Sequence, residues 1–100
     1  MYNAFKFNLN EMYKLNLNQK DSIGYFLQDM EYHGRSKRTR DAYYRVLTGF
    51  QLFLNNERNT KIEDATQRDC MAWLHGVRKI SSPSTIATYA SYVNRFYRYM

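Results

Sequence analysis

The chain has 100 residues, 44% of them hydrophobic, which is the size and composition of one small domain with a thin core. Its single cysteine, Cys70, excludes an internal disulfide, and no apolar run approaches the ~20 residues that would span a bilayer. The formal net charge of +6 indicates an anionic partner. We therefore expect a cytoplasmic protein without a membrane partner.

The excess positive charge is concentrated in two segments. Residues 35–45 contain five basic side chains and one acid, and residues 78–100 contain four basic side chains and no acid. The stretches outside them, 1–34 and 46–77, each carry one more acid than base. A solvated surface usually mixes its signs, so this segregation indicates a polyanionic partner.

The N-terminal residues 1–19 differ from the rest of the chain, because they hold five Asn among scattered Phe, Leu and Tyr. Phe5, Phe7 and Leu9 alternate as in a strand, but no partner strand is evident elsewhere. We expect an N-terminal arm, partly disordered or docked as a short element, followed by a helical domain over 20–100.

The first expected helix covers roughly 21–33. Asp21 is the candidate N-cap, because its short acceptor side chain can satisfy free N–H groups of the first turn, and Gly34 is a natural stop. Apolar residues recur at helical spacing between them, which predicts one buried face. These residues are Ile23, Phe26, Leu27 and Met30.

The second expected helix runs from about 37 to 56. Ser36 is its candidate N-cap, and the polar cluster at 55–60 ends it. Its apolar residues follow a helical period over five turns, which predicts a long buried stripe. The stripe comprises Thr39, Tyr43, Leu47, Phe50 and Leu54, flanked by Val46 and Phe53.

The third expected helix is shorter, at about 67–75. Thr66 and Asp69 have the spacing of a capping box, and Gly76 is expected to end the helix. Ile62, just upstream, is expected to be buried in the core. The inward-facing side chains are expected to be Met71 and Leu74, with Trp73 as a further candidate.

The fourth expected helix starts at Ser82 and Pro83, a capping serine followed by proline at the first helical position. It repeats the Ser-x-x-Thr-x-x-x-Tyr spacing that begins at Ser36, at an offset of 46 residues. Any two capped amphipathic helices look alike to some degree, but here the residue identities recur and both copies open a basic segment. Its stripe comprises Thr85, Tyr89, Val93, Phe96 and Met100, flanked by Tyr92 and Tyr99.

The order and spacing of three segments carry a resemblance to a known family. The segments are Ser36-Lys-Arg-Thr39 with the stripe that follows it, Ile62-Glu-Asp-Ala-Thr66-Gln-Arg-Asp69, and Ser82-Pro-Ser-Thr85-Ile86 followed by Arg95-Phe96-Tyr97. Together, over about 21–100, they resemble the N-terminal core-binding domain of tyrosine recombinases, the phage integrases. The resemblance implies an all-α, four-helix, SAM-like bundle that forms half of a clamp around DNA. It also implies that the second and fourth helices lie toward the major groove.

The same resemblance implies that this chain does not cleave DNA by itself. Tyrosine recombinases cleave with a C-terminal domain that supplies arginines, a lysine, a His-x-x-Arg motif and a tyrosine nucleophile. His75-Gly-Val-Arg78 spells His-x-x-Arg, but it ends a short helix inside the core-binding pattern, and the other catalytic residues have no matching motif. Tyr97 and Tyr99 belong to the fourth helix. We expect no catalytic residue, no cofactor and no metal site.

The candidate DNA-binding residues lie mostly on the helix faces opposite the apolar stripes, at about 100° per residue. Arginines and hydroxyl groups suit phosphate contacts, and small residues on the fourth helix would let its backbone approach DNA. A solvated helix face would show the same pattern; Asp41 and Thr48 share the face of the second helix. The candidates are Lys37, Arg38, Arg40, Tyr44, Arg45, Ser84, Thr85, Thr88, Ser91 and Arg95.

Two classes of function fit these observations. The first is duplex DNA binding for a site-specific recombinase, in the cytoplasm with the nucleoid, with double-stranded DNA and other recombinase protomers as partners and no small-molecule substrate. The second is a stand-alone helical protein-interaction or regulatory module that uses its basic faces against an acidic partner. Salt-dependent binding to duplex DNA distinguishes the two classes.

Overall fold

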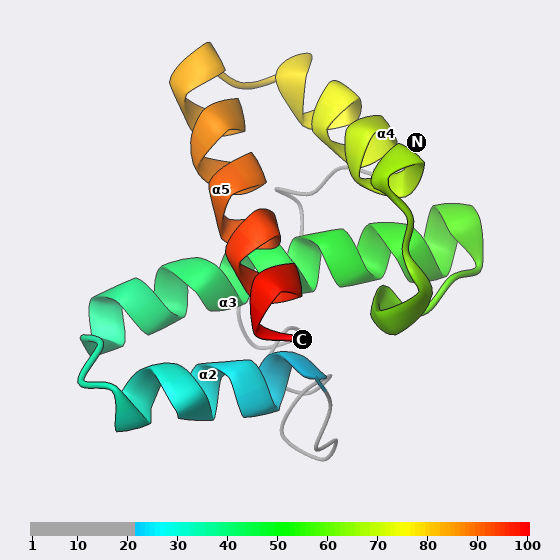
Figure 1. The fold of residues 1–100 in the computed structure, drawn as a ribbon. Helices are drawn as coiled ribbons and strands as arrows, with labels where there is room; N and C mark the ends of the chain where they lie inside the picture. The colour runs from blue at the N-terminus through cyan, green and yellow to red at the C-terminus, as the bar shows by residue number, and fades with distance from the viewer. Residues whose placement is uncertain (1–21) are drawn as a thin grey trace.

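The computed structural model describes residues 22–100, which form four α-helices and no strand (Figure 1). The helices are α2 at Ser22–Tyr32, α3 at Lys37–Phe53, α4 at Gln67–Arg78 and α5 at Pro83–Tyr99. A π-helical turn at Leu54–Arg58 continues α3, and a 3-10 turn at Ile62–Asp64 precedes α4. The all-α, four-helix class expected from the sequence is confirmed. The expected arm at 1–19 and the expected cap Asp21 lie outside the described residues.

Helix α3 is the central element of the bundle. Helices α2 and α5 both pack against it, and α4 contacts both α3 and α5 (Figure 1). Every side chain from 46 to 50 is buried, so this part of α3 has no solvent-facing side. Thr48, expected on the polar face, is fully buried, and that expectation is wrong because neighbours enclose the C-terminal half of α3 from several directions.

The core between the helices is largely aromatic. Phe26 of α2 meets Phe96 of α5 edge-on, with ring centroids 5.5 Å apart. Phe50 of α3 lies 5.1 Å from Trp73 of α4, and Trp73 stacks on Tyr89 of α5 at 5.7 Å. Aromatic pairs at such distances add to the stabilisation that burial provides. One ring system therefore joins all four helices.

The expected core stripe is largely confirmed on α3, where Thr39 and the flanking Phe53 are only half-buried, and it is confirmed in part on α5, where only Val93 and Phe96 are buried. Tyr89 is only half-buried, because one of its ring faces lies on Trp73 while the rest of the side chain reaches the surface. Tyr99 and Met100, at the end of the expected stripe, are exposed. The side chains that are buried as expected are Tyr43, Leu47, Phe50, Leu54, Val93 and Phe96.

Helix α4 is rotated relative to the expectation. Trp73, Leu74 and Val77 face the core, whereas Met71 is 60% exposed. Met71 stands about 200° around the helix from Trp73, so both cannot face inward, and the larger indole takes the buried position. The helix also passes through Gly76 to Arg78 instead of ending there, because the buried Val77 belongs to its inward face.

The expected caps at Ser36, Thr66 and Ser82 are confirmed, and the caps of α3 and α5 repeat the same hydrogen bonds. The hydroxyl of Ser36 accepts from the backbone N–H of Thr39 at 3.2 Å, and that of Ser82 accepts from the N–H of Thr85 at 3.3 Å. In each cap the two hydroxyls also pair with one another, at 3.0 and 3.1 Å. Helices α3 and α5 thus begin in the same way. Thr66 and its capping box begin α4, also as expected.

The turn between α2 and α3 is a Schellman motif centred on Gly34. The N–H of Gly34 donates to the carbonyl of Glu31, and the N–H of Arg35 donates to the carbonyl of Met30, both at 3.0 Å. Gly34 has φ of 78°, in the left-handed region where other residues are strained. This turn reverses the chain and places Arg35 beside the end of α2.

We expect Gly34→Ala to lower the free energy of unfolding by about 1 kcal/mol, because alanine is strained at this φ. A Cβ here would meet no atom within 4 Å, so the loss measures the backbone conformation alone. Gly76→Ala is the matched control, since it also adds a Cβ in open space but inside α4, where alanine favours the helix. Urea denaturation followed by circular dichroism should show opposite signs for the two variants; equal shifts would contradict the prediction.

Candidate nucleic-acid interface

The N-terminal half of α3 presents one exposed basic face. Lys37, Arg38, Asp41, Ala42 and Arg45 line a shallow depression on it. Lys37 Nζ lies 3.2 Å from Asp41 Oδ2, so the one acid on this face is already paired. Among residues 22–100, no carboxylate lies within ion-pair distance of Arg38 or Arg45. Two guanidinium groups are therefore left to attract an anion.

Helix α5 presents a line of small hydroxylated residues that ends in arginine. Ser84, Thr88, Ser91 and Arg95 are all exposed and follow helical spacing along one side. The hydroxyl of Thr88 donates to the carbonyl of Ser84 at 3.0 Å. Thr85 is half-buried and its hydroxyl belongs to the cap of the helix, so its main contact is structural.

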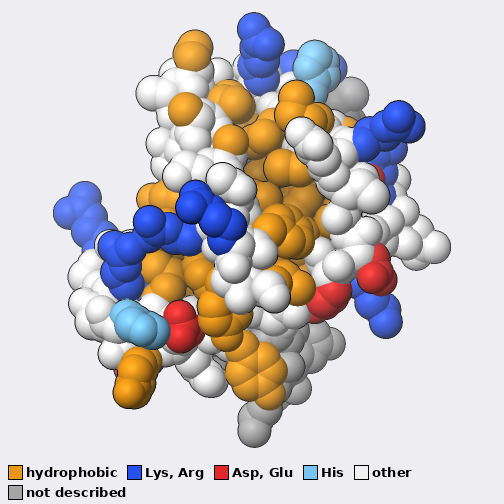
Figure 2. Space-filling view, in the orientation of Figure 1, with side chains coloured by type: hydrophobic (Ala, Val, Ile, Leu, Met, Phe, Trp, Pro, Cys, Tyr) orange, Lys and Arg blue, Asp and Glu red, His pale blue; other side chains and the backbone are white. Residues whose placement is uncertain are grey.

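The two faces adjoin on the surface. Tyr43 of α3 and Tyr92 of α5 stack with centroids 3.9 Å apart and hold the helices together. Burial raises the pKa of the Tyr89 hydroxyl on α5, and the positive charge of Arg45 partly offsets that rise. Figure 2 shows Lys and Arg side chains gathered over the N-terminal half of α3 and the adjoining part of α5.

Two candidates from the sequence do not belong to this surface. Tyr44 is only 5% exposed and packs in the core, so the expectation that it lies off the core stripe is wrong, and its burial leaves little of the side chain for a ligand. Arg40 has a side chain that is 28% exposed and pairs with Glu31 of α2 at 3.3 Å. This ion pair joins α3 to α2, and it leaves less of the Arg40 charge for an external anion.

Two arginines that were not among the DNA-binding candidates from the sequence lie beside the interface. Arg35 follows the Schellman turn, and Arg98 lies one helical turn after Arg95 on the same side of α5. The i, i+3 spacing of Arg95 and Arg98 was a sequence signal for the second of these. Arg35 carried no such signal, because its position depends on how α2 packs against α5.

One family model matches most of the chain. The model described as "Phage integrase, N-terminal SAM-like domain" matches residues 23–100, which include all four helices except the first residue of α2. The chain belongs to this family. No curated protein and no solved structure matches the chain. The resemblance read from the sequence is therefore confirmed, and the matched unit is the N-terminal domain of the integrase.

The described part of the SAM-like domain shows no arrangement of nucleophile and catalytic partners. His75 and Arg78 are exposed at the end of α4, and Tyr97 donates its hydroxyl to the carbonyl of Ile62 at 2.7 Å. Burial raises the pKa of Tyr97 far above its ordinary value, and nearby Cys70 adds to the rise. A hydroxyl held in this way keeps its proton and is a poor nucleophile.

The described residues of the SAM-like domain offer little for other kinds of site. No group of His, Cys, Asp and Glu side chains in residues 22–100 could hold a metal ion. Over the same residues, every helix is too short or too polar to cross a membrane. Burial raises the pKa of the Cys70 thiol, which disfavours the reactive thiolate. The basic surface of α3 and α5 is the best-supported candidate site.

Proposed function

We propose that this SAM-like domain, residues 20–100, binds double-stranded DNA on behalf of a tyrosine recombinase of the phage integrase type. The observation that carries the proposal is the continuous exposed surface of α3 and α5, on which Arg38, Arg45 and Arg95 have no carboxylate partner among residues 22–100. Guanidinium groups arranged over one face suit the regularly spaced phosphates of a duplex.

The shape of the α5 face supports a close approach to DNA. Ser84, Thr88 and Ser91 leave no bulky side chain between the helix backbone and a ligand, and a major groove is wide enough to admit a helix. The capped N-termini at Ser36 and Ser82 add unpaired N–H groups and the positive ends of two helix dipoles to the same basic segments. These features favour phosphate contacts, with base contacts made by the side chains that reach the groove.

In this proposal the domain supplies affinity and part of the site recognition. Strand cleavage and rejoining are carried by another domain of the recombinase. The partners are duplex DNA and other recombinase protomers, and the setting is the cytoplasm where the DNA lies.

The experiment that tests the proposal is binding to duplex DNA across a salt series, measured by fluorescence anisotropy. With about four or five phosphate contacts, the slope of log affinity against log salt should be about −4, because each contact contributes about −0.9. Circular dichroism at each salt concentration confirms that the domain stays folded. A slope near zero would overturn the proposal and favour a protein-interaction module that meets an acidic partner.

A further inference from the structure

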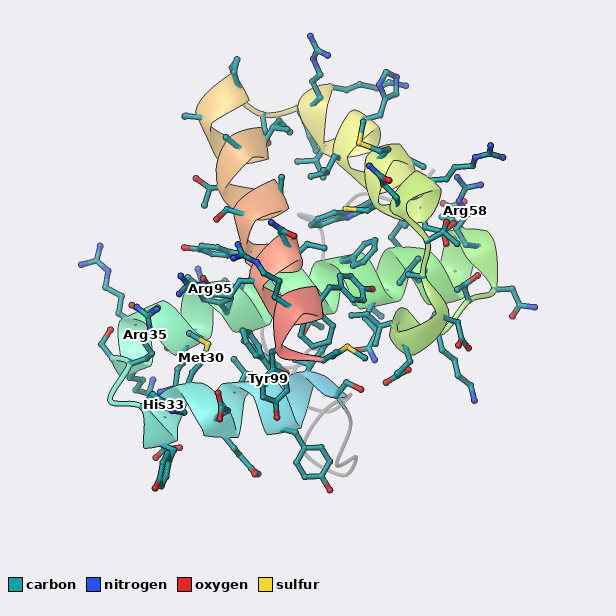
Figure 3. All side chains as sticks on the ribbon, in the orientation of Figure 1. Met30, His33, Arg35, Arg58, Arg95 and Tyr99 are labelled. Atoms are coloured by element: carbon teal, nitrogen blue, oxygen red, sulfur yellow. The ribbon has the colours of Figure 1, made fainter. Side chains whose placement is uncertain are left out.

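A pocket lies beside the proposed duplex interface, at the place where the end of α2, the turn after it and the last turns of α5 meet (Figure 3). Its volume is about 500 Å³, and it is a wide-open surface depression and not an enclosed cavity. That volume is within the range of small-ligand sites. Three arginines and three apolar side chains dominate its walls, namely Arg35, Arg95, Arg98, Phe26, Met30 and Tyr99.

The charge of this pocket is strongly positive. Its one acid, Asp29, already faces His33, whose Nδ1 lies 3.5 Å from the carboxylate and 2.8 Å from the Asp29 carbonyl. No ion pair with a carboxylate engages Arg35, Arg95 or Arg98 within the described part of the chain. The planar guanidinium can donate two parallel hydrogen bonds to a phosphate, which a lysine cannot do.

The apolar wall offers one aromatic surface. Phe26 and Met30 are 3% and 5% exposed, so they form the base of the pocket and leave little area for a ligand. Tyr99 is 43% exposed, and its ring lies 5.2 Å from that of Phe26 and is tilted by 55°. The ring is therefore supported from inside the protein and partly open to the pocket.

We propose that this pocket holds one unpaired nucleotide of DNA, with its phosphate on the arginines and its base stacked on Tyr99. The inference rests on the proposed function, because Arg95 belongs both to this pocket and to the duplex interface. A strand that leaves the duplex at Arg95 therefore enters the pocket directly. Stacking on an aromatic ring requires no particular base, since every base has a π face.

The experiment compares a blunt duplex with the same duplex that carries a short single-stranded extension, both measured by anisotropy at one salt concentration. The extension should tighten binding by between about fivefold and a hundredfold. Tyr99→Leu should abolish this gain while blunt-duplex affinity stays unchanged, and Arg98→Gln should reduce the gain. Tyr32→Leu is the matched control, because Tyr32 is 86% exposed and lies outside the pocket.

An abasic extension provides a second arm that needs no variant. It keeps the phosphates but removes the bases, so the wild-type chain should lose most of the gain. An equal affinity for blunt and extended duplexes, or a gain that survives in the abasic extension, would overturn the inference. Competition for the pocket by an acidic peptide that contains tyrosine, without any gain from the extension, would assign it to a protein partner instead. Failure to bind the blunt duplex counts separately, against the proposed function.

Discussion

Replacing Phe50 or Phe96 by Ala is expected to lower the free energy of unfolding by about 3–5 kcal/mol. Both side chains are fully buried. The ring centroid of Phe50 lies 5.1 Å from that of Trp73, and the ring centroid of Phe96 lies 5.5 Å from that of Phe26. Each substitution therefore leaves a cavity at a contact between helices. The total stability of such a small domain is about 5–15 kcal/mol, so either loss is a large part of it.

Urea denaturation followed by circular dichroism measures this loss. Met71→Ala is the matched control, because Met71 is also a large apolar side chain but is 60% exposed, and its removal should change the stability by less than about 0.5 kcal/mol. If the two phenylalanine variants unfold at the same urea concentration as the parent, the arrangement of the core is wrong.

The second large effect concerns DNA. Replacing both Arg38 and Arg45 by Ala should make the salt slope about two units shallower, because each phosphate contact contributes about 0.9 to it. Affinity at low salt should fall in parallel, and the stability should stay near that of the parent because both side chains are exposed. The measurement is anisotropy on duplex DNA over a salt series.

The matched control removes the same charge elsewhere. Lys61 and Arg68 are exposed and lie outside both basic segments, so the pair Lys61→Ala and Arg68→Ala also lowers the net charge by two. Its salt slope should stay close to that of the parent. Equal flattening by the two pairs would mean that total charge, and not the α3 face, governs binding, and would contradict the proposed interface.

Much of the fold followed from local patterns in the sequence. Caps at Ser36, Thr66 and Ser82 depend on contacts within a few residues, and the structure confirms all three. The errors at Thr48 and Met71 have a different origin. A periodic pattern locates a helix face that suits one neighbour, but it does not reveal that α3 is enclosed from several sides or which residue of α4 takes the inward position.

The candidate site was also predicted only in part, because local patterns locate exposed helix faces but not the contacts between helices. Arg38, Arg45 and Arg95 stand on exposed faces that helical spacing alone locates. The use of Arg40 in an ion pair with Glu31 depends on the packing of α2 against α3. The pocket at Arg35 likewise joins segments that are far apart in the chain, and such neighbours become visible only in three dimensions.

The position of α5 in the chain has a consequence for how the domain is made. This helix contacts each of the other three, and Tyr97 on it satisfies the carbonyl of Ile62 at the entrance to α4. Because α5 is the last of the four helices in the chain, a ribosome releases it after the others, and the core lacks Phe96 and Val93 until α5 emerges. The earlier helices keep exposed apolar faces until α5 emerges and completes the core.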